Sequence, residues 1–328
     1  SGKNSATMQG SNARRADVSA LTRARWRFID AADAALSLLY SGQTRRLTPY
    51  LFLVPAFLIV GVIVAGLYYV GDSSLRVLDR STFLQSDDYS LDNYVNIYER
   101  AGYRSVLYRT FSGASIVTIA VLLLSFPYAY LMVRTQSSFL RKFLLFNLFL
   151  PFFLGQVVRA YGWLIILGQQ GLVNGILAQM GLPNISVLYT NTAVIIGLIQ
   201  YMLPFGVLMM APALTAIDND IEAAAEGLGA KWYQTLWYVV LPLAKPGFVA
   251  ATVVVFTITL TEFAIPAILG GGTNDFVANA IYDAFFRVSD MGAGSALGVV
   301  LIVIGTTLVS VLFALMGTGT AGFLKEDK

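Results

Sequence analysis

Long runs of apolar residues alternate with short polar segments from residue 50 to the end of the chain. A helix needs about 20 apolar residues to cross roughly 30 Å of hydrocarbon. Six runs have about that length: residues 50–70, 110–133, 143–167, 192–214, 247–269 and 295–316. We therefore predict an all-α membrane protein with six transmembrane helices, whose even number places both termini on one side.

The segments outside these runs complete the predicted organisation. Residues 1–48 are polar and rich in arginine, which predicts a tail rather than a cleavable signal peptide. Within this tail, residues 17–40 suit a helix on the membrane surface and a solvated segment equally well. The six-span domain occupies residues 49–320, and residues 321–328 form a second tail.

Lysine and arginine are distributed unevenly among the connections between the runs. Fifteen of the 22 lie in the tails and in the second and fourth connections, against six in the odd connections. Short cytoplasmic loops carry such an excess, so the tails and the even connections are predicted to be cytoplasmic. On the outer face, SLDNY (Ser90–Tyr94) predicts the start of a short helix within the polar residues 71–109.

The composition excludes most familiar enzymes. Only 12% of the 328 residues are charged and 56% are hydrophobic, whereas roughly 25% are charged in an ordinary soluble domain. The absence of cysteine and histidine removes thiolate metal sites, the commonest general base and the metal-binding imidazole. A net charge of +3 is too small to indicate a nucleic-acid partner. We predict that the chain is not an enzyme and binds no cofactor or metal of its own.

The fourth connection carries the most informative motif, DNDIEAAAEGLGAKWYQTLWYVVLPLAKPG, which begins at Asp218. Asp218 suits a helix N-terminus, and glycine permits a sharp turn at Gly229. Helical spacing resumes at Lys231 and is predicted to stop at Pro242 and Pro246. Two short helices at this place either link two spans or offer a surface that a cytoplasmic partner grips.

The same stretch resembles the EAA loop in permease subunits of binding-protein-dependent ABC importers. The resemblance rests on EAA at Glu222–Ala224, LGA at Leu228–Ala230 and LP at Leu241–Pro242. It extends over residues 50–318 and looks closest to the spermidine/putrescine branch. The landmarks of that branch, in order, are SLDNY, PYAYLM, RAYGW, GLVNGILAQMGL, TEFAIPAILGG and IYDAFF.

The resemblance implies a type I importer permease fold, in which residues 216–246 form a coupling loop that docks on a cytoplasmic ATPase. The family's glutamate lies six residues before the glycine of LGA, whereas Glu222 lies seven before Gly229. Either the first helix is shifted by one residue or Ala223 takes that place. The residues implied in ATPase coupling are Glu222, Ala223, Ala224, Glu226, Gly227, Gly229 and Ala230.

The resemblance also implies the partners and the cargo. The partners are an ATPase dimer that uses ATP and Mg, a sister permease chain and a periplasmic substrate-binding protein. The chain itself has no GxxxxGK[ST] phosphate loop. In the bacterial inner membrane, such a subunit would move a small cation such as putrescine or spermidine inward by alternating access. Opines, amino-acid derivatives, phosphonates and ferric iron are alternative cargoes. A secondary transporter that works alone would leave the EAA-like loop unexplained.

Two ionisable residues fall within the predicted spans, Arg159 and Glu262. A charge at the bilayer centre costs at least roughly 2.5 kcal/mol, so such residues have partners or functions. Glu262 is either a pore carboxylate that accepts a substrate ammonium or a structural partner for Arg159 or for a hydroxyl such as Thr259 or Thr261. For Arg159 the structural interpretation is favoured, because a fixed cation repels a cationic cargo.

Aromatic residues form a second candidate surface, since their ring faces attract ammonium groups. They are Tyr161, Trp163, Phe263 and Tyr282. Anchoring at the membrane interface is the competing interpretation. The acids Asp275, Asp283 and Asp290 attract cations or a basic receptor in one interpretation and are solvated loop charges in the other. The predicted substrate pathway consists of Glu262, Phe263, Tyr161, Trp163 and Arg159.

Prolines inside the predicted spans indicate breaks in the helices. They are Pro127, Pro151, Pro204, Pro212 and Pro266. Each removes a backbone donor and leaves a carbonyl free. Such a break survives in a membrane only where protein or a water-filled cavity satisfies the backbone.

Overall fold

A computed structural model of the chain describes residues 48–79 and 84–316. The predicted tails, including the surface helix at 17–40, therefore lie outside the described residues. The chain divides into two compact units, residues 1–68 and residues 69–328. Of the first unit the structure describes the start of α2 (Thr48–Ser74), a helix long and apolar enough to cross a membrane, as predicted.

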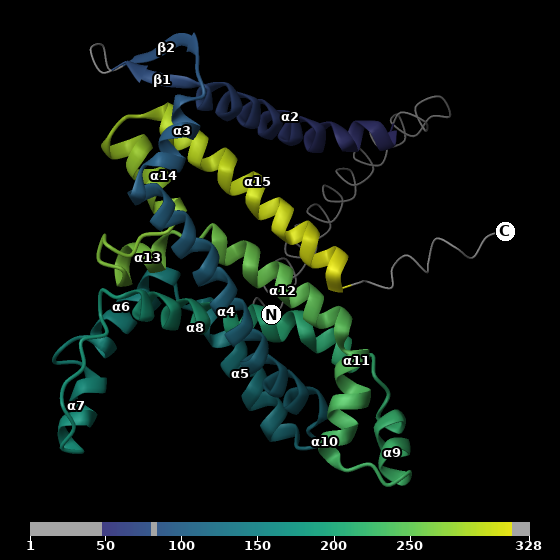
Figure 1. The fold of residues 1–328 in the computed structure, drawn as a ribbon. Coiled ribbons are helices and arrows are strands. Elements are labelled where there is room, and N and C mark those ends of the chain that lie inside the picture. Colours follow the sequence, from purple (N-terminus) through teal and green to yellow (C-terminus); the bar gives the residue numbers. More distant parts are fainter. Residues whose placement is uncertain (1–47, 80–83, 317–328) are drawn as a thin grey trace, which may run out of the picture. The chain divides into compact units, whose positions relative to one another are not determined.

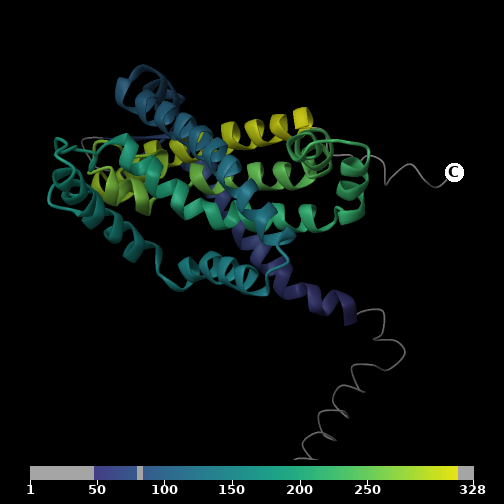
Figure 2. The ribbon, with the colours of Figure 1, turned by 90° about the horizontal axis from the view of Figure 1, so that it is seen from below.

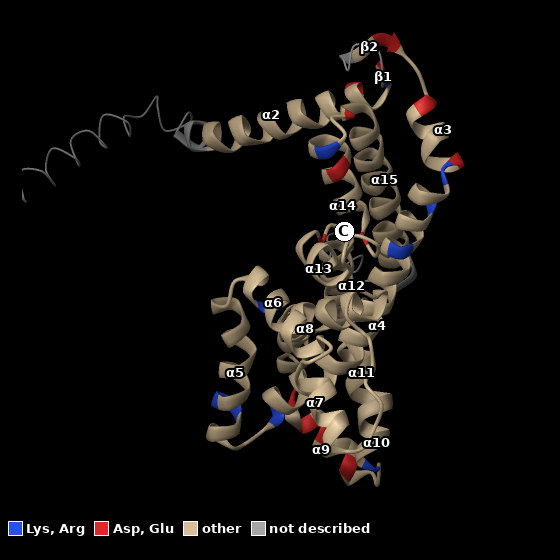
Figure 3. Ribbon diagram, turned by 90° about the vertical axis from the view of Figure 1, so that its left-hand side faces the viewer, with Lys and Arg blue, Asp and Glu red and all other residues tan. Residues whose placement is uncertain are grey.

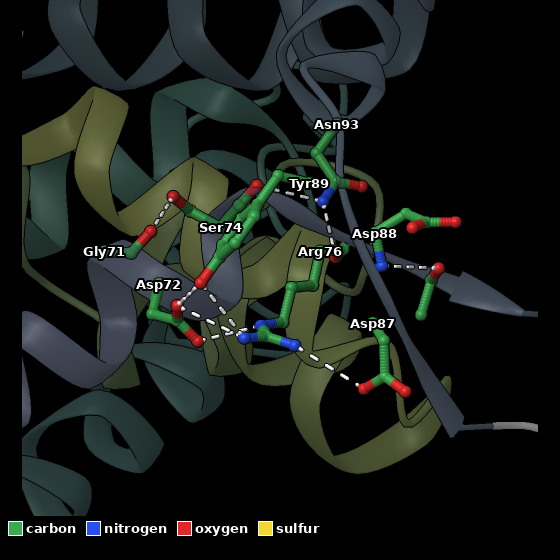
Figure 4. Close-up of polar contacts among 9 residues, drawn as sticks. Gly71, Asp72, Ser74, Arg76, Asp87, Asp88, Tyr89 and Asn93 are labelled. Carbon is green, nitrogen blue, oxygen red and sulfur yellow. Dashed lines mark hydrogen bonds and ion pairs between the residues drawn. The ribbon is translucent and has the colours of Figure 1, made fainter.

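In the second unit, the end of α2 is followed by a small antiparallel hairpin that the sequence did not predict, formed by β1 (Arg76–Asp79) and β2 (Leu84–Tyr89). Arg76 pairs with Tyr89 across the strands and donates to its hydroxyl at 3.1 Å. Arg76 Nε also donates to Asp72 Oδ2 at 2.8 Å, which holds the pKa of Arg76 above its ordinary value. The hairpin is thereby tied to the last turn of α2 (Figure 4).

The predicted outer helix follows the hairpin as α3 (Asp92–Glu99), so SLDNY does mark a helix start. Asn93, which is buried, donates from its side chain to the carbonyls of Ser74 and Arg76 at 3.0 and 2.9 Å. One side-chain amide thus satisfies two backbone acceptors and fixes α3 against the base of the hairpin (Figure 4).

Three helices form the core of the second unit and pack against one another in pairs: α4 (Ala101–Arg134), α8 (Asn191–Thr215) and α12 (Lys245–Leu260) (Figures 1 and 2). Side chains such as Val121, Met202 and Val255 are fully buried between them. The predicted spans 110–133 and 192–214 lie within α4 and α8, each of which is a single helix long and apolar enough to cross a membrane.

Small residues let these helices approach closely. A Cβ on Gly206 of α8 would lie 2.6 Å from Val121 Cγ1 of α4, and one on Gly247 of α12 would lie 2.7 Å from the Cβ of Ala213 in α8. Helix association in lipid depends on such close packing, because hydrocarbon already surrounds the apolar side chains.

The predicted span 143–167 is wrong as a single helix. It consists of α5 (Ser138–Phe153) and α6 (Gln156–Leu167), and the chain bends by 101° between α5 and the segment 156–179. Pro151 removes a hydrogen bond in the last turn of α5, and the extended conformation of Leu154 and Gly155 turns the chain.

The predicted span 247–269 is also broken, since α12 ends at Leu260 and α13 (Ala264–Leu269) begins after a gap. Before it lie α9 (Asn219–Gly227), α10 (Trp232–Thr235), the π-helical turn η2 (Leu236–Val240) and α11 (Leu241–Leu243). The continuous helix formed by α10, η2 and α11 ends at Leu243, one residue after Pro242, as predicted. The next helix, α12, begins at Lys245 with Pro246 in its first turn, where no amide donor is needed, and the chain bends by 66° between the two helices.

Three prolines predicted to interrupt helices do not. Pro127 lies inside the continuous α4, and Pro204 and Pro212 lie inside the continuous α8. Each removes one backbone bond, and the helix continues on both sides because neighbouring helices hold it.

The remaining elements are α7 (Leu172–Gln179), α14 (Val277–Tyr282), the π-helical turn η3 (Asp283–Arg287) and α15 (Met291–Met316). The last predicted span, 295–316, lies within α15. Charged residues gather at two ends of the second unit, which we call the hairpin end (β1, β2 and α3) and the α9 end (α5, α9 and α10) (Figure 3). The nearly uncharged band between them is what a membrane-spanning unit requires.

The close contact at Gly247 yields a stability prediction. Gly247→Ala should lower the free energy of unfolding by about 1–3 kcal/mol, because the new Cβ would overlap Ala213 and Met210 and force α12 away from α8. Gly298→Ala in α15 is the matched control, since nothing lies within 4 Å of its Cβ position. Thermal unfolding in detergent measures both, and equal unfolding temperatures for the two variants would contradict the packing argument.

Candidate functional site

Residues 216–246, which we call the α9 loop, begin with the predicted form of two short helices joined at a glycine. Asp218 caps α9 by accepting the amide of Asp220 at 3.1 Å. At the other end, the amides of Gly229 and Ala230 donate back to the carbonyls of Glu226 and Ala225 at 2.9 and 3.1 Å. Gly229 has φ +89°, which a residue with a side chain rarely adopts. This is a complete glycine-terminated helix end.

A partly buried ion pair ties α9 to the end of α4. Arg134 Nε donates to Glu222 Oε1 at 2.8 Å, and the two side chains are only 16% and 14% exposed. Tyr130 Oη donates to the other carboxylate oxygen at 2.7 Å. Arg134 also donates to Asn219 Oδ1 at 2.6 Å and to the carbonyl of Ile217 at 2.9 Å. We call this set of bonds the Arg134 clasp.

The clasp changes the interpretation of Glu222, whose carboxylate binds within its own chain. The other residues predicted to couple to an ATPase do present themselves to solvent. Ala223, Ala224, Glu226, Gly227 and Gly229 are exposed, and Ala230 is partly exposed. Sequence reasoning missed two exposed apolar neighbours, Leu228 at 91% and Trp232 at 73%. The sequence signal that could have identified these two residues is the presence of large apolar side chains close to the glycines of the turn.

Glu262 occupies the break between α12 and α13. It is 6% exposed, and its Oε1 accepts the amides of Ala264 and Ile265 at 3.0 and 3.4 Å and the side-chain amide of Gln156. The next position of α13 is Pro266, which has no donor, and the amide of Ala267 donates to the carbonyl of Phe263 at 3.1 Å. Every backbone donor in the first turn of α13 is thus accounted for.

The predicted partners of Glu262 are wrong. Among the described residues no ion pair joins it to Arg159, and the hydroxyls of Thr259 and Thr261 donate to carbonyls of their own helix. Arg159 instead lies over the ring of Tyr201, with its guanidinium carbon 4.8 Å from the ring centre. A capping carboxylate that accepts several N–H groups satisfies its charge without a cation.

The predicted pathway residues fall into two groups. Arg159 and Trp163 lie where α6, α8 and α13 meet, with no room for a water molecule between them, and the indole of Trp163 donates to Gln200 at 3.3 Å. Phe263 lies away from them beside Tyr282, with ring centres 5.0 Å apart. Tyr161 is 55% exposed on α6. Among the described residues, no group of three or more aspartates and glutamates is placed to hold a metal ion.

Comparisons with known proteins identify the family. Residues 106–320 match the model of the binding-protein-dependent transport system inner membrane component. The chain belongs to this family. It is therefore a multi-pass inner-membrane component of a transport system, and the predicted all-α importer-permease fold is confirmed.

Several of its relatives are spermidine/putrescine permeases. The spermidine/putrescine transport system permease protein PotB of Haemophilus influenzae is 34% identical over 226 residues, 68% of this chain and 78% of that protein. PotB of Escherichia coli is 31% identical over 259 residues, 78% of this chain and 93% of that protein.

A solved bacterial ABC transporter that imports the acidic polysaccharide alginate shares the fold. Its TM-score is 0.69 at 17% identity, and the match covers 85% of this chain and 98% of that one.

The Arg134 clasp should control how firmly α9 is held. Glu222→Gln keeps the shape but removes the charge, so amide hydrogen exchange in residues 219–227 should become about tenfold faster, as expected for a lost charge-assisted bond. Glu226→Gln on the exposed side of the same helix is the matched control and should leave exchange unchanged. Unchanged exchange in Glu222→Gln would show that the clasp does not hold the loop.

The helix break makes a second prediction. Glu262→Ala orphans two buried amides and should cost about 1–3 kcal/mol of stability, seen as a lower unfolding temperature. Glu262→Gln keeps an acceptor oxygen at the same place and should cost much less. Equal losses in both variants would indicate that charge, rather than hydrogen-bond acceptance, stabilises the break.

Proposed function

We propose that this chain is the permease subunit of an ATP-driven importer that moves a polyamine, such as putrescine or spermidine, from periplasm to cytoplasm. The supporting observation is its 31–34% identity to spermidine/putrescine permeases over most of its length. The chain itself is non-catalytic, and it binds no cofactor. An ATPase dimer supplies the energy with ATP and Mg, a sister permease completes the pore, and a periplasmic binding protein delivers the substrate.

The proposed orientation places the α9 end and both termini in the cytoplasm. The excess of lysine and arginine in the tails and even connections supports this arrangement. The α9 loop then presents Leu228, Gly229 and Ala230 to the ATPase, where close approach of two backbones needs small residues and an apolar anchor.

The Arg134 clasp gives the proposed coupling a mechanical route. A force on α9 reaches α4 through charge-assisted bonds of 2.6–2.9 Å, rather than only through the chain to α8 and α12. Because α4, α8 and α12 pack pairwise, a displacement of α9 moves the core together. Alternating access then follows as a rigid-body change of the core between inward-open and outward-open arrangements.

Arg159 supports a second candidate cargo within the same importer class. Its Nε is buried and, among the described residues, has no hydrogen-bond partner. A cation at this position suits a substrate that also carries a carboxylate, such as an opine or an amino-acid derivative. Competition between spermidine and a zwitterionic amino-acid derivative for uptake separates the two cargoes.

Reconstitution tests the proposed function directly. The chain with its sister permease, the ATPase and the binding protein in proteoliposomes should take up radiolabelled spermidine or putrescine only with ATP inside the compartment that holds the ATPase. Glu262→Gln, which keeps the cap, should slow this uptake about tenfold if its charge also meets the passing cation. Uptake at the wild-type rate would leave Glu262 with a capping role alone. Absence of any polyamine uptake by a complex that hydrolyses ATP would contradict the proposed cargo.

A further inference from the structure

A hollow of about 220 Å³ opens beside the break in the fifth span. Phe263, the residue after the buried Glu262, forms part of its wall, and the rest comes from residues between Ala267 in α13 and Arg287 in η3. It adjoins a larger hollow of about 770 Å³ that reaches β1 and the start of α4 at the hairpin end. Asp275 and Asp283 line both hollows, so these carboxylates stand where the two meet.

One wall of the smaller hollow is aromatic. Phe263 and Tyr282 have ring centres 5.0 Å apart, and Phe286 continues the row 4.8 Å beyond Tyr282. The first two rings are 39% and 43% exposed, so their faces are available. Rings in this arrangement contact methylene groups and attract an ammonium group through their faces.

Two acidic residues, Asp275 and Asp283, also line the smaller hollow, and their charges are incompletely neutralised. Asp283 pairs with Arg287 at 3.1 Å, but that arginine is 74% exposed and free to move away. Among the described residues the Asp275 carboxylate has no ion-pair partner. Burial and the neighbouring charge of Asp283 raise its pKa, and the opposing effects of Arg109 and Arg287 do not cancel the rise. The ionised form of Asp275 therefore lowers the stability of the folded protein, and a cation bound beside it would reduce this loss.

We infer that this hollow is a cation subsite of the permease, in which one ammonium group of an aliphatic diamine lies between Asp275 and Asp283 and its methylene chain against Phe263 and Tyr282. The inference rests on the proposed function and specifies where the cargo first meets this chain. The larger hollow is the approach from the hairpin end, and Phe263, at the break between α12 and α13, lines the smaller one. In the absence of cargo Arg287 pairs with Asp283, and the incoming ammonium group replaces Arg287 in this ion pair.

Putrescine itself is the probe. The wild-type complex is purified without the binding protein or nucleotide, and its unfolding temperature is followed against putrescine concentration, with sodium chloride matching the ionic strength. A ligand that binds the folded state raises this temperature with its own saturation curve. Asp275→Asn and Asp283→Asn should each raise the half-saturating concentration about tenfold, the change expected for a lost charge-assisted contact. Arg287→Gln removes the competing cation and should lower it.

A surface control and a stability control accompany these variants. Asp87→Asn makes the same charge change at a fully exposed side chain of the hairpin and should leave the curve unchanged. Without putrescine, Asp275→Asn should unfold at a higher temperature than the wild type at neutral pH. The raised pKa means that the ionised carboxyl costs stability above it, and this gain should vanish as the pH falls through that pKa.

The outcomes separate the subsite from the proposed function. Uptake of polyamine with identical putrescine curves for wild type, Asp275→Asn and Arg287→Gln would overturn the subsite and leave the proposed function intact. Loss of binding-protein affinity in the Asp variants, with an unchanged putrescine curve, would assign these carboxylates to receptor docking and likewise overturn it. A wild-type complex that hydrolyses ATP yet takes up no polyamine contradicts the proposed function, and the subsite falls with it.

Discussion

The break at Glu262 depends on one constraint, that no backbone donor can be left without a partner inside a membrane. Continuous helices meet this constraint by themselves, but the fifth span ends at Leu260 and restarts at Ala264. A single carboxylate and a single proline resolve the problem, the first by accepting two amides and the second by having none. The break in turn places Phe263 beside Tyr282 and thereby creates the aromatic wall of the hollow at the hairpin end.

Helix α4 connects the two ends of the second unit. Near the hairpin end, Thr110 accepts the first amide of α14 at 2.9 Å, and Arg109 donates to the carbonyl of Asp275 at 3.1 Å. At the α9 end the same helix finishes in Arg134. One continuous helix therefore contacts both the segment that carries Asp275 and Asp283 and the loop that we propose meets the ATPase. Because α4 is continuous, a displacement of the helix at one end of the unit also moves the residues that it contacts at the other end.

The length of the apolar runs predicted four long helices well, because an uncharged run of about 20 apolar residues rarely forms anything other than a membrane-spanning helix. It failed where local backbone chemistry decides. Composition alone could not show that Glu262 turns back on the amides that follow it, since the same residue in a continuous helix would look identical in sequence. The hairpin was missed because its pairing depends on Arg76, Tyr89 and Asp72 meeting in space.

The candidate site was predicted unevenly for related reasons. The turn at Gly229 follows from glycine's freedom at positive φ and was visible in the sequence. The partner of Glu222 was not, because Arg134 is 88 residues away along the chain. Likewise, Phe263 and Tyr282 were singled out as aromatic candidates, but only the fold brings them to the same hollow as Asp275 and Asp283.

A proline inside a continuous helix, such as Pro204, differs from Pro266 at the helix break in which residues can replace it. In α8, a Pro204→Ala exchange would supply an amide N–H that can donate to the carbonyl one turn earlier in the helix. The backbone therefore tolerates substitution at that position. At Pro266 the same exchange would introduce an N–H into a turn whose capping carboxylate oxygen, Glu262 Oε1, already accepts three N–H groups. Position 266 is therefore expected to be held fixed for as long as a carboxylate stands four residues before it.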